Sequence, residues 1–491
     1  MFSTMAGIFA RTPRVAPSLS APLMTQIPNL PWWKQLTPYH WFVFFVASAA
    51  WCFDCLDQQL FILARKNAIQ TLLGIDGGLE FSKVDPAKVN QWGGYATSIF
   101  IMGWATGGLI FGSVGDRIGR AKTLALTVLL YSICTGLSAF SRSIFDFCIY
   151  RFITGLGVGG VFGLAVALVA DALPETARPK ALGLLQALSA TGNVTAGLCA
   201  MAVAKMDPTL SWKYMFWIGA IPAFLCIFIM LRLKEPEKWV HARAASRETG
   251  GKTMGSYIEM FRDRRWRAPA LFGMVLCIAG VVGLWGVGFF SPELVGPAIE
   301  ASLKGQGLTG PELGAEKGRW ISYNLIIQNI GAFAGMVVFS KVCHVIGRKK
   351  AFAAGFILAF VATVYFFKNF SGKGDIWMSA VMGFCQLSLF AGFAIYLPEL
   401  FPTRLRSTGT SFCYNVGRFI AASGPFTLGA LQKFLGEKAV QALPAGADAA
   451  QETAAKLEAF RDAACYLSGI FFLGLIALIF LPETKGRPLP E

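Results

Sequence analysis

The sequence has few charged residues for its length. Asp, Glu, Lys and Arg make up 15% of its 491 residues, whereas roughly 25% is usual in soluble proteins. So little charge does not cover a water-soluble globule of this size. The net charge of +16 would by itself be compatible with nucleic acid, but we expect no nucleic-acid partner because the basic residues sit between long apolar runs.

Other absences remove most catalytic chemistry. The chain has three His, and the closely spaced Cys52 and Cys55 have no second pair of cysteines beside them, so a zinc site is not expected. No Gly-x-x-x-x-Gly-Lys-Ser/Thr phosphate loop occurs, so ATP hydrolysis is not the expected energy source. We therefore expect neither an enzyme nor a bound cofactor or metal.

What the sequence does have is apolar length. Apolar residues make up 55% of the chain, and Phe alone occurs 42 times. Runs of about 20 apolar residues recur, each long enough to cross roughly 30 Å of hydrocarbon as a helix. They lack the alternation of membrane strands, which excludes a barrel. We predict an all-α membrane protein with twelve spans, at 40–64, 91–113, 121–140, 144–171, 178–204, 213–233, 268–290, 319–342, 350–367, 375–398, 405–432 and 463–482.

The distribution of basic residues predicts the orientation in the membrane. Of the 44 Lys and Arg, 26 lie on the side that holds both termini and 16 lie in the opposite loops. Cytoplasmic loops carry the excess of basic residues in membrane proteins. We therefore expect an integral protein of the cell (inner or plasma) membrane, with both termini and the central loop in the cytoplasm.

The spans divide into six and six around a basic central loop. Two short patterns recur in the second half: Gly112 to Arg120 resembles Ser340 to Arg348 at a spacing of 228 residues, and Arg178 to Gly183 resembles Arg404 to Gly409 at 226. Such a parallel duplication is typical of one large class of secondary transporters. We predict a cytoplasmic tail (1–38), an N-terminal six-helix bundle (39–233), a linker (234–267), a C-terminal six-helix bundle (268–482) and a second tail (483–491).

Several motifs together resemble one transporter family. Gly112-xxx-Asp116-Arg117-x-Gly119-Arg120 is similar to the signature loop of the major facilitator superfamily, and Arg151 to Gly160 resembles its fourth-helix motif. Glu235 to Trp239, Leu397 to Gly409 and Pro482 to Arg487 are similar to the sugar-porter and organic-ion branches. The resemblance extends from about residue 40 to 487. It implies two pseudo-symmetric six-helix bundles around a central cavity, working by alternating access.

The signature loop implies a set of residues for conformational coupling. A carboxylate at a helix end can cap a neighbouring helix and pair with Arg, which favours one docking of the two halves. In the second loop, His344 and Val345 stand where Asp and Arg are expected, which puts an equivalent ion-pair latch in doubt. The predicted coupling residues are Gly112, Asp116, Arg117, Gly119, Arg120, Arg151, Arg404 and Arg406.

Glycines in the second and fourth spans predict close helix packing. Gly103-xxx-Gly107 and Gly108-xxx-Gly112 are small-xxx-small patterns, which let two helices approach closely. We expect ordinary packing from these glycines.

The acidic residues inside the first span are more informative. A carboxylate near the bilayer centre costs roughly 2.5–3.5 kcal/mol on insertion scales, so it usually faces a cavity or a partner. Asp54, Asp57 and Gln58 are three and four residues apart and share a helix face. Two carboxylates on one buried face repel, which favours a proton on one of them. The alternative is a structural Asp paired with an Arg of another span.

Asp54-Cys-Leu-Asp57 resembles the first-helix Asp-x-x-Asp of aromatic-acid and related carboxylate–proton symporters. Cys55 replaces the glycine that usually follows the first Asp in that family.

Arg418, inside the eleventh span, needs an anion because its guanidinium is always charged. The anion can be Asp54, Asp57 or a substrate carboxylate, and Asn415 lies on the same helix face. A purely structural ion pair is the alternative. Further amides can line a pocket or simply join helices: Gln186 and Asn193, then Asn324, Gln328 and Asn329, and Gln386.

We interpret the chain as a secondary transporter, with proton-coupled symport of a small organic acid as the preferred function. Asp54 or Asp57 would carry the proton, Arg418 would attract the anion, and Gln58, Gln186, Gln328 and Asn415 would shape the pocket. A sugar carrier is the first alternative, although the amides of the sugar family are absent from Leu276 to Gly288. A drug or organic-cation exporter and a transport-incompetent nutrient sensor are the others. The expected partners are an anionic solute, a proton and the bilayer, and we expect a monomer.

Overall fold

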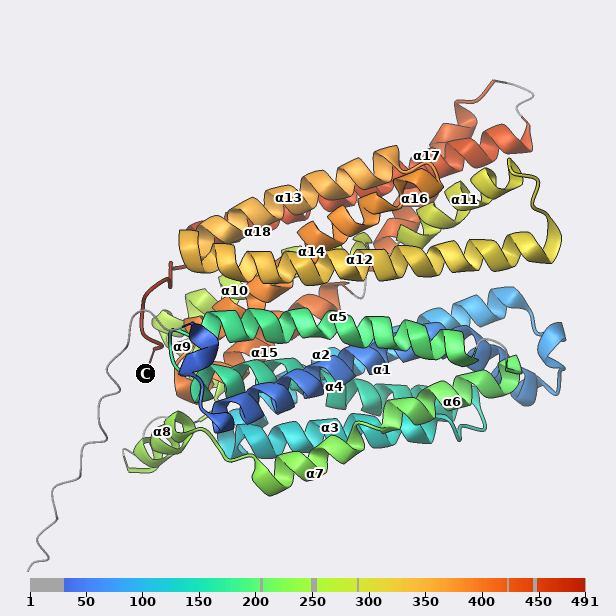
Figure 1. Cartoon of the computed structure of the whole chain (residues 1–491). Coiled ribbons are helices and arrows are strands. Elements are labelled where there is room, and N and C mark those ends of the chain that lie inside the picture. Colours follow the sequence, from blue (N-terminus) through green and yellow to red (C-terminus); the bar gives the residue numbers. More distant parts are fainter. Residues whose placement is uncertain are drawn as a thin grey trace, which may run out of the picture.

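The computed structural model describes residues 31–203, 206–248, 254–288, 291–421, 424–444 and 448–490. Every regular element in these ranges is a helix. The predicted tail 1–38 therefore lies largely outside the described residues. The helices gather into two bundles that lie side by side, one from each half of the chain (Figure 1).

The bundle formed by the first half contains seven helices, because the sixth predicted span is broken. Thr37 caps the first helix by accepting a hydrogen bond from the backbone N–H of His40, and Pro38 starts it, where the missing N–H of proline is not needed. The helices are α1 (Pro38–Gly77), α2 (Pro86–Ile118), α3 (Arg120–Ser138), α4 (Ile144–Ala172), α5 (Arg178–Val203), α6 (Pro208–Ala220) and α7 (Ala223–Arg232).

The bundle formed by the second half begins after two short linker helices, α8 (Glu237–Glu248) and α9 (Tyr257–Arg262). The helices of this bundle are α10 (Arg264–Gly286), α11 (Ser291–Lys304), α12 (Gly310–Ile346), α13 (Arg348–Asn369), α14 (Trp377–Tyr396), α15 (Arg406–Ala421), α16 (Gly424–Gln441), α17 (Ala449–Ser468) and α18 (Phe471–Phe480). The twelfth predicted span is also built from two helices, α17 and α18.

Both ends of the described chain lie at the same end of the molecule as the linker helices. Figure 1 shows α8, α9 and the C-terminus together at this end. The Tyr39 hydroxyl near the start of α1 receives a hydrogen bond from the backbone N–H of Lys234, and Arg406 donates to the carbonyl of Pro490. We call this end the linker end and the opposite one the far end.

Nine helices in the described part of the chain are long and apolar enough to cross a membrane. Three predicted spans are not among them. The sixth is interrupted between α6 and α7 at Ile221 and Pro222, and the eleventh includes residues 422–423, which lie outside the described residues. α5 has 26 residues, so its composition rather than its length sets it apart from the nine.

Glycines bring pairs of helices into close contact in both bundles. A Cβ placed on Gly103 or Gly107 of α2 would overlap the backbone of α4, and one on Gly331 or Gly335 of α12 would overlap the backbone of α14. The two glycine pairs are 228 residues apart, the same spacing as the repeated loops. The packing role predicted for Gly103 and Gly107 is confirmed, and the second half repeats it.

The two bundles meet along two seams. One seam lies between α2 and α15, and the other lies between α5 and α12. Residues along these four helices therefore face the other half of the protein, and α4 and α14 add further contacts between the halves, with α15 and α5 respectively.

Candidate functional site

Asp54 lies on α1 with a fully buried side chain. Gln58, one turn later, donates a hydrogen bond of 3.0 Å to Oδ2 of Asp54. Oδ1 of Asp54 receives no hydrogen bond from the described part of the chain. The guanidinium of Arg418, which belongs to the other bundle, attracts this carboxylate. Asp54 and Arg418 are thus opposite charges that attract each other across the boundary between the two halves, and no hydrogen bond joins Oδ1 of Asp54 to Nε of Arg418.

The Arg418 guanidinium is held mainly by aromatic rings. Its central carbon lies 3.7 Å from the ring centre of Trp104 on α2 and 4.2 Å from that of Tyr414 on α15. Cation–π contacts of this kind contribute about 2 kcal/mol when desolvated. Nη1 of Arg418 donates to Oδ1 of Asn415 at 2.6 Å, while its Nε has no partner in the described residues. A buried guanidinium with spare donors is suited to bind a carboxylate.

Aromatic rings from both bundles surround this charge. The Trp104 ring packs edge-on against Trp285 of α10, with 5.8 Å between ring centres. Tyr414 stacks on Phe162 of α4 at 3.9 Å. The charged centre is therefore enclosed by flat apolar faces, which exclude water and strengthen electrostatic attraction inside.

Asp57 contacts different groups from Asp54, although the two are three residues apart. Oδ1 of Asp57 accepts a hydrogen bond of 2.6 Å from Thr135 of α3, and the carboxylate attracts Arg151 of α4. Oδ2 of Asp57 and Nη1 of Arg151 have no hydrogen-bond partner in the described part of the chain. Asp57 therefore faces the inside of the first bundle, and Asp54 faces the second bundle.

Arg151 is enclosed by hydroxyls and rings of the first bundle. It donates hydrogen bonds to Thr135, Ser138 and Thr154. Its guanidinium also lies 4.7 Å from the ring centre of Phe216. The structure therefore separates Arg151 from the other predicted coupling residues, which lie at the linker end.

The predicted amides take different positions. Gln186 on α5 is buried, and its Oε1 has no partner in the described residues. Gln328 on α12 packs against Gly383 of α14, within the second bundle. Asn324, one turn before it, bonds to Ser291 and Ser379 and so joins helices of that bundle.

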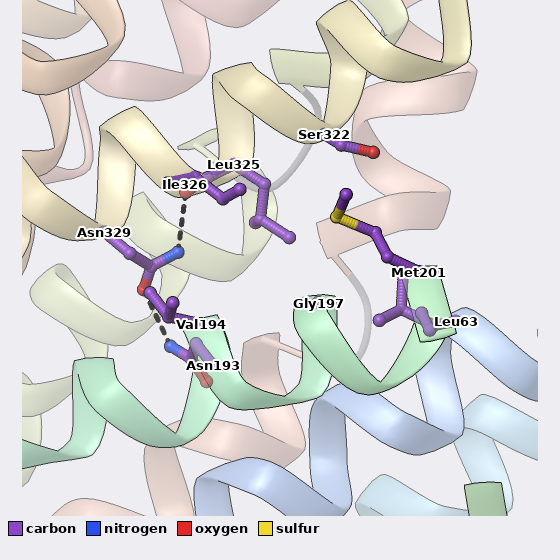
Figure 2. Close-up of a pocket in the computed structure, with 10 residues that line it drawn as sticks. Leu63, Asn193, Val194, Gly197, Met201, Ser322, Leu325, Ile326 and Asn329 are labelled. Carbon is purple, nitrogen blue, oxygen red and sulfur yellow. Dashed lines mark hydrogen bonds between the residues drawn. The ribbon is translucent and has the colours of Figure 1, made fainter. Parts of the chain in front are cut away.

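Asn329 is the amide of α12 that faces the other half. Its Oδ1 accepts a hydrogen bond of 2.9 Å from Nδ2 of Asn193 on α5 (Figure 2). Among the missed residues, Trp104 carried no signal beyond its position in a glycine-rich span. Tyr414 precedes Arg418 by four residues, and this helical spacing does place two side chains together.

The remaining coupling residues form a network at the linker end. Asp116, at the end of α2, accepts hydrogen bonds from the backbone N–H groups of Ser407 and Thr408 at 3.2 and 2.8 Å, and from the Thr408 hydroxyl at 2.7 Å. These N–H groups open α15, where a carboxylate stabilises the helix dipole. Gly112 makes room for this contact, because a Cβ there would overlap Ser411 of α15.

Arg120 and Arg406 extend the network around one further carboxylate. Both pair with Asp171 at the end of α4, although they come from different halves of the chain. Arg120 also pairs with Asp116 at 3.4 Å and donates to the carbonyl of Thr403 at 2.7 Å. Sequence reasoning missed Asp171, because nothing in its local pattern marks it as the shared partner of two arginines.

The linker itself enters this seam. Arg117 donates to the carbonyls of Met254 and Gly255 at 3.3 and 3.4 Å, and Ser113 donates to the latter at 2.5 Å. On the other side, Arg404 pairs with Glu259 of α9 at 2.5 Å.

Tyr257, between these contacts, reaches deeper into the seam and donates to the carbonyl of Leu109 at 2.6 Å. Residues 254–259, which we call the linker insert, therefore contact both α2 and the start of the α15 region.

The described residues contain no group of three or more His, Cys, Asp or Glu side chains placed to hold a metal ion. The chemistry available at the centre is therefore that of paired charges, amides and aromatic faces. Such a site can bind and release a small charged solute, and it can exchange protons through its carboxylates.

Comparisons with known proteins agree on the kind of protein. The chain is 26% identical over 407 residues to a probable 4-methylmuconolactone transporter of Cupriavidus pinatubonensis, covering 82% of this chain and 87% of that one. It is 28% identical over 424 residues to a niacin transporter of Acinetobacter baylyi, covering 83% and 89%.

The fold is similar to that of the proton:xylose symporter XylE from E. coli, with a TM-score of 0.68, 18% identity and coverage of 92% and 98%. The family model of the Major Facilitator Superfamily matches residues 47–425. The twelve-helix fold, expected from motifs and apolar runs, is therefore confirmed, and so is the expectation that the protein is not an enzyme. The chain is an integral membrane transporter and belongs to the Major Facilitator Superfamily.

Proposed function

We propose that this protein is a proton-coupled symporter of a small organic acid and works by alternating access. One observation carries the proposal: a buried arginine, Arg418, lies where the two bundles meet and faces the carboxylate of Asp54 from the other bundle. A solute carboxylate entering between the bundles would compete with Asp54 for this guanidinium. The names of the relatives, a muconolactone and a niacin carrier, support a small organic acid as the solute.

Proton coupling follows from the competition. While Asp54 is charged it neutralises Arg418, and the empty site is balanced. When Asp54 takes up a proton it stops competing, and Arg418 becomes free for the anion. Proton and anion would then bind together, which is the requirement for symport. Asp57 is the second candidate for the proton, and its exchange would act on Arg151 inside the first bundle.

The pocket would be shaped by the groups around this pair. Asn415 orients Arg418, Gln58 orients Asp54, and Trp104 and Tyr414 offer flat faces to a conjugated or aromatic acid. Gln186 has an oxygen without a partner in the described chain and could accept a hydrogen bond from the solute. Gln328 lies within the second bundle, and its role stays a prediction.

The linker end would face the cytoplasm, as the distribution of basic residues predicts. In this structure the Asp116 network and the linker insert bridge the halves at that end. Breaking these contacts would open the linker end, and closing the far end would complete the cycle. We expect a monomer in the plasma membrane, because each chain holds a complete charged centre.

A sugar carrier is the main competing function, because the fold resembles a xylose symporter. In the described part of α10, the residues that a sugar carrier would use for amide contacts are apolar, such as Leu276, Cys277 and Ile278. A sugar needs hydrogen-bonding partners on most of its faces, so this helix favours an organic acid.

Uptake into proteoliposomes tests the proposal. Labelled nicotinate, benzoate and cis,cis-muconate should be compared with xylose, with and without an inward proton gradient. We expect saturable, gradient-driven accumulation of at least one acid and none of xylose. Arg418→Lys keeps the charge but loses the stacked plane, and it should lower Vmax/KM at least about tenfold, equivalent to about 1.4 kcal/mol.

The carboxylate variants separate proton coupling from solute binding. Asp54→Asn should abolish gradient-driven accumulation but retain exchange of labelled for unlabelled acid, because exchange needs no net proton movement. Asp57→Asn should be measured in the same way. Xylose uptake that ignores pH, or unchanged acid uptake in all three variants, would refute the proposal.

A further inference from the structure

A cavity of about 180 Å³ lies between α5 and α12 (Figure 2). It belongs to both halves of the chain, because one wall comes from α5 with Leu63 of α1 and the other from α12. We call it the α5–α12 cavity. It is lined by Leu63, Asn193, Val194, Gly197, Ala200, Met201, Ser322, Leu325, Ile326 and Asn329.

The lining of this cavity carries no charge. Its polar groups are largely engaged with one another: Asn193 donates to Asn329, and Asn329 donates to the carbonyl of Leu325 at 2.8 Å (Figure 2). Ser322 donates back to its own helix at Gly318. A carboxylate placed here would lose its hydration without gaining a partner, so the cavity suits an uncharged ligand.

Size and shape narrow the class of ligand. An engineered apolar cavity of about 150 Å³ binds benzene. The α5–α12 cavity therefore has room for one six-membered ring with a small neutral substituent. Branched aliphatic side chains on both walls and the paired amides at one edge fit a flat ring with a single polar group.

The cavity lies beside the charged centre and is separate from it. None of its lining residues is Asp54, Gln58, Asn415 or Arg418. Asn193 is nevertheless at the depth of Asp54, because a Cβ on the preceding Gly192 would overlap the backbone around Cys52 and Leu56. A ligand in the cavity can therefore influence the carrier while the central site stays free.

The two helices that form the cavity are in contact nearer the linker end. Ser340 of α12 donates to the carbonyl of Pro179 of α5 at 3.2 Å, and a Cβ on Gly183 would overlap Ser340. Towards the far end the same two helices are separated by the cavity. Closing the far end in the proposed alternating-access cycle would bring its walls together.

We infer that the α5–α12 cavity is an inhibitory site for a small uncharged aromatic molecule, which holds the two bundles apart towards the far end. The inference rests on the proposed alternating access, because a ligand that binds only one of two states shifts the equilibrium to that state. The bound molecule would keep α5 and α12 apart and would not be transported.

Binding of benzamide to the purified full-length protein tests the site. Gly197→Leu fills the cavity, and a Cβ at this position meets nothing within 4 Å, so the helix itself has room for the change. Gly94→Leu is a matched control, because Gly94 on α2 is equally open and lies outside the cavity. Benzamide should bind at least about tenfold more weakly to Gly197→Leu and equally well to Gly94→Leu.

Transport kinetics give a second measurement. Benzamide should lower the maximal rate of acid uptake without raising KM, because the central site remains free. Gly197→Leu should imitate the ligand: a lower maximal rate, normal equilibrium binding of the acid and no further response to benzamide. If this variant fails to fold, Ser322→Leu fills the same cavity from the opposite wall.

Several results would overturn the inference. Benzamide that binds equally well to both filled variants lies elsewhere, and benzamide that raises only KM competes at the central site. Binding that appears only after stripping phospholipid would assign the cavity to an acyl chain. If no organic acid is bound or transported but benzamide binding still depends on residue 197, the proposed function fails and the binding site stands.

Discussion

The two seams between the bundles are built from corresponding helices, yet in the described part of the chain only one of them is held by a charged group. At the seam between α2 and α15, Asp116 accepts three hydrogen bonds from Ser407 and Thr408. At the seam between α5 and α12, His344 stands in the corresponding position, and uncharged groups join the helices: the Ser340 hydroxyl with the carbonyl of Pro179, and Asn193 with Asn329.

The helix starts explain why the second seam needs no carboxylate. The N–H groups of Ser407 and Thr408 open α15 without a partner in their own helix and turn to Asp116. At α5, the N–H of Arg178 donates to the carbonyl of Pro174, and that of Ala181 donates to Ala177. The N–H groups at the start of α5 thus have hydrogen-bond acceptors in the preceding turn of the chain and do not need one from α12.

The corresponding arginines pair with corresponding carboxylates, because Asp171 and Glu399 are also 228 residues apart. Arg120 pairs with Asp171, which pairs in turn with Arg406 of the other bundle. Arg348 pairs with Glu399 at 2.7 Å, and Glu399 accepts a further hydrogen bond from Thr484 of its own half. The comparison teaches that duplication preserved the packing of both seams, while the electrostatic contact between the halves is concentrated in one of them.

Removing the carboxylate of Asp116 should have the largest effect. Asp116→Asn weakens three charge-assisted hydrogen bonds and should destabilise the closed linker end by about 3 kcal/mol. Spin labels at the exposed positions 122 and 350 would report a wider distance distribution. Asp462→Asn is the control, because it removes a carboxylate that pairs with Lys368 of α13, away from the helices of both seams. Equal distances in both variants would contradict a latch at this seam.

Replacing the loop glycines Gly119 and Gly347 should destabilise the protein equally in the two halves. Gly119 and Gly347 have φ angles of 135° and 97°, in a region open mainly to glycine, and a Cβ on either would crowd a glutamate. Alanine at each position should lower the stability by about 2 kcal/mol. Thermal unfolding in detergent measures both variants. A clearly larger loss in one half would extend the asymmetry of the seams to the loops.

The glutamates that cap α3 and α13 should contribute equally to stability at neutral pH. Glu235 accepts from the N–H groups of Arg120, Ala121 and Lys122, and Glu483 accepts from those of Arg348 and Lys349. Glutamine at either site should cost about 1 kcal/mol, as expected for a partly exposed cap.

Acid should erase the effect at Glu483. Burial raises the pKa of Glu483, but the backbone N–H groups around it outweigh this effect, so its pKa lies below the ordinary 4.5. The stabilisation is thus present above pH 4.5 and is lost as the pH falls through the folded pKa. The gap in Tm between wild type and Glu483→Gln should shrink on acidification below that range. A gap that persists unchanged would assign the loss to packing.

Restoring the missing acid should have the smallest effect. His344→Asp recreates the motif of the first half, but the start of α5 offers no free N–H groups to it. Lys180 of α5 acts electrostatically on position 344 and should still attract the new charge by about 0.5 kcal/mol. The same spin-label pair would show a slight narrowing. A shift as large as that of Asp116→Asn would mean that the seams are equivalent.

The fold could be predicted from the sequence further than the site. Apolar length fixes the spans, because about 20 residues must cross the hydrocarbon whatever their neighbours are. Glycine spacing predicted that the helix of Gly103 and Gly107 packs closely against another helix, because two glycines four residues apart leave room for a neighbouring backbone. The structure identifies α4 as that neighbour. The break in the sixth span was missed, because both halves of that span remain apolar.

The site depended on contacts between distant segments. Helical spacing put Asp54 and Asp57 together, but only the packing of α3, α4 and α15 shows that one faces Thr135 and the other faces Arg418. Likewise, sequence reasoning chose Gln328 among the three amides of α12 as a pocket residue, whereas the rotation of the helix in its bundle places Asn329 at the seam. The roles of these residues in transport stay predictions.

The linker insert does more than connect the two halves covalently, because it also packs between them. Tyr257 and Gly255 lie between α2 and the α15 region, so in the proposed cycle we expect the halves to separate at this end only after that stretch has moved away. We therefore expect the connecting peptide to influence the rate of the transport cycle as well as to join the two halves. Replacing it with a linker of equal length but different sequence should change the turnover rate of the carrier and leave its affinity for the solute unchanged.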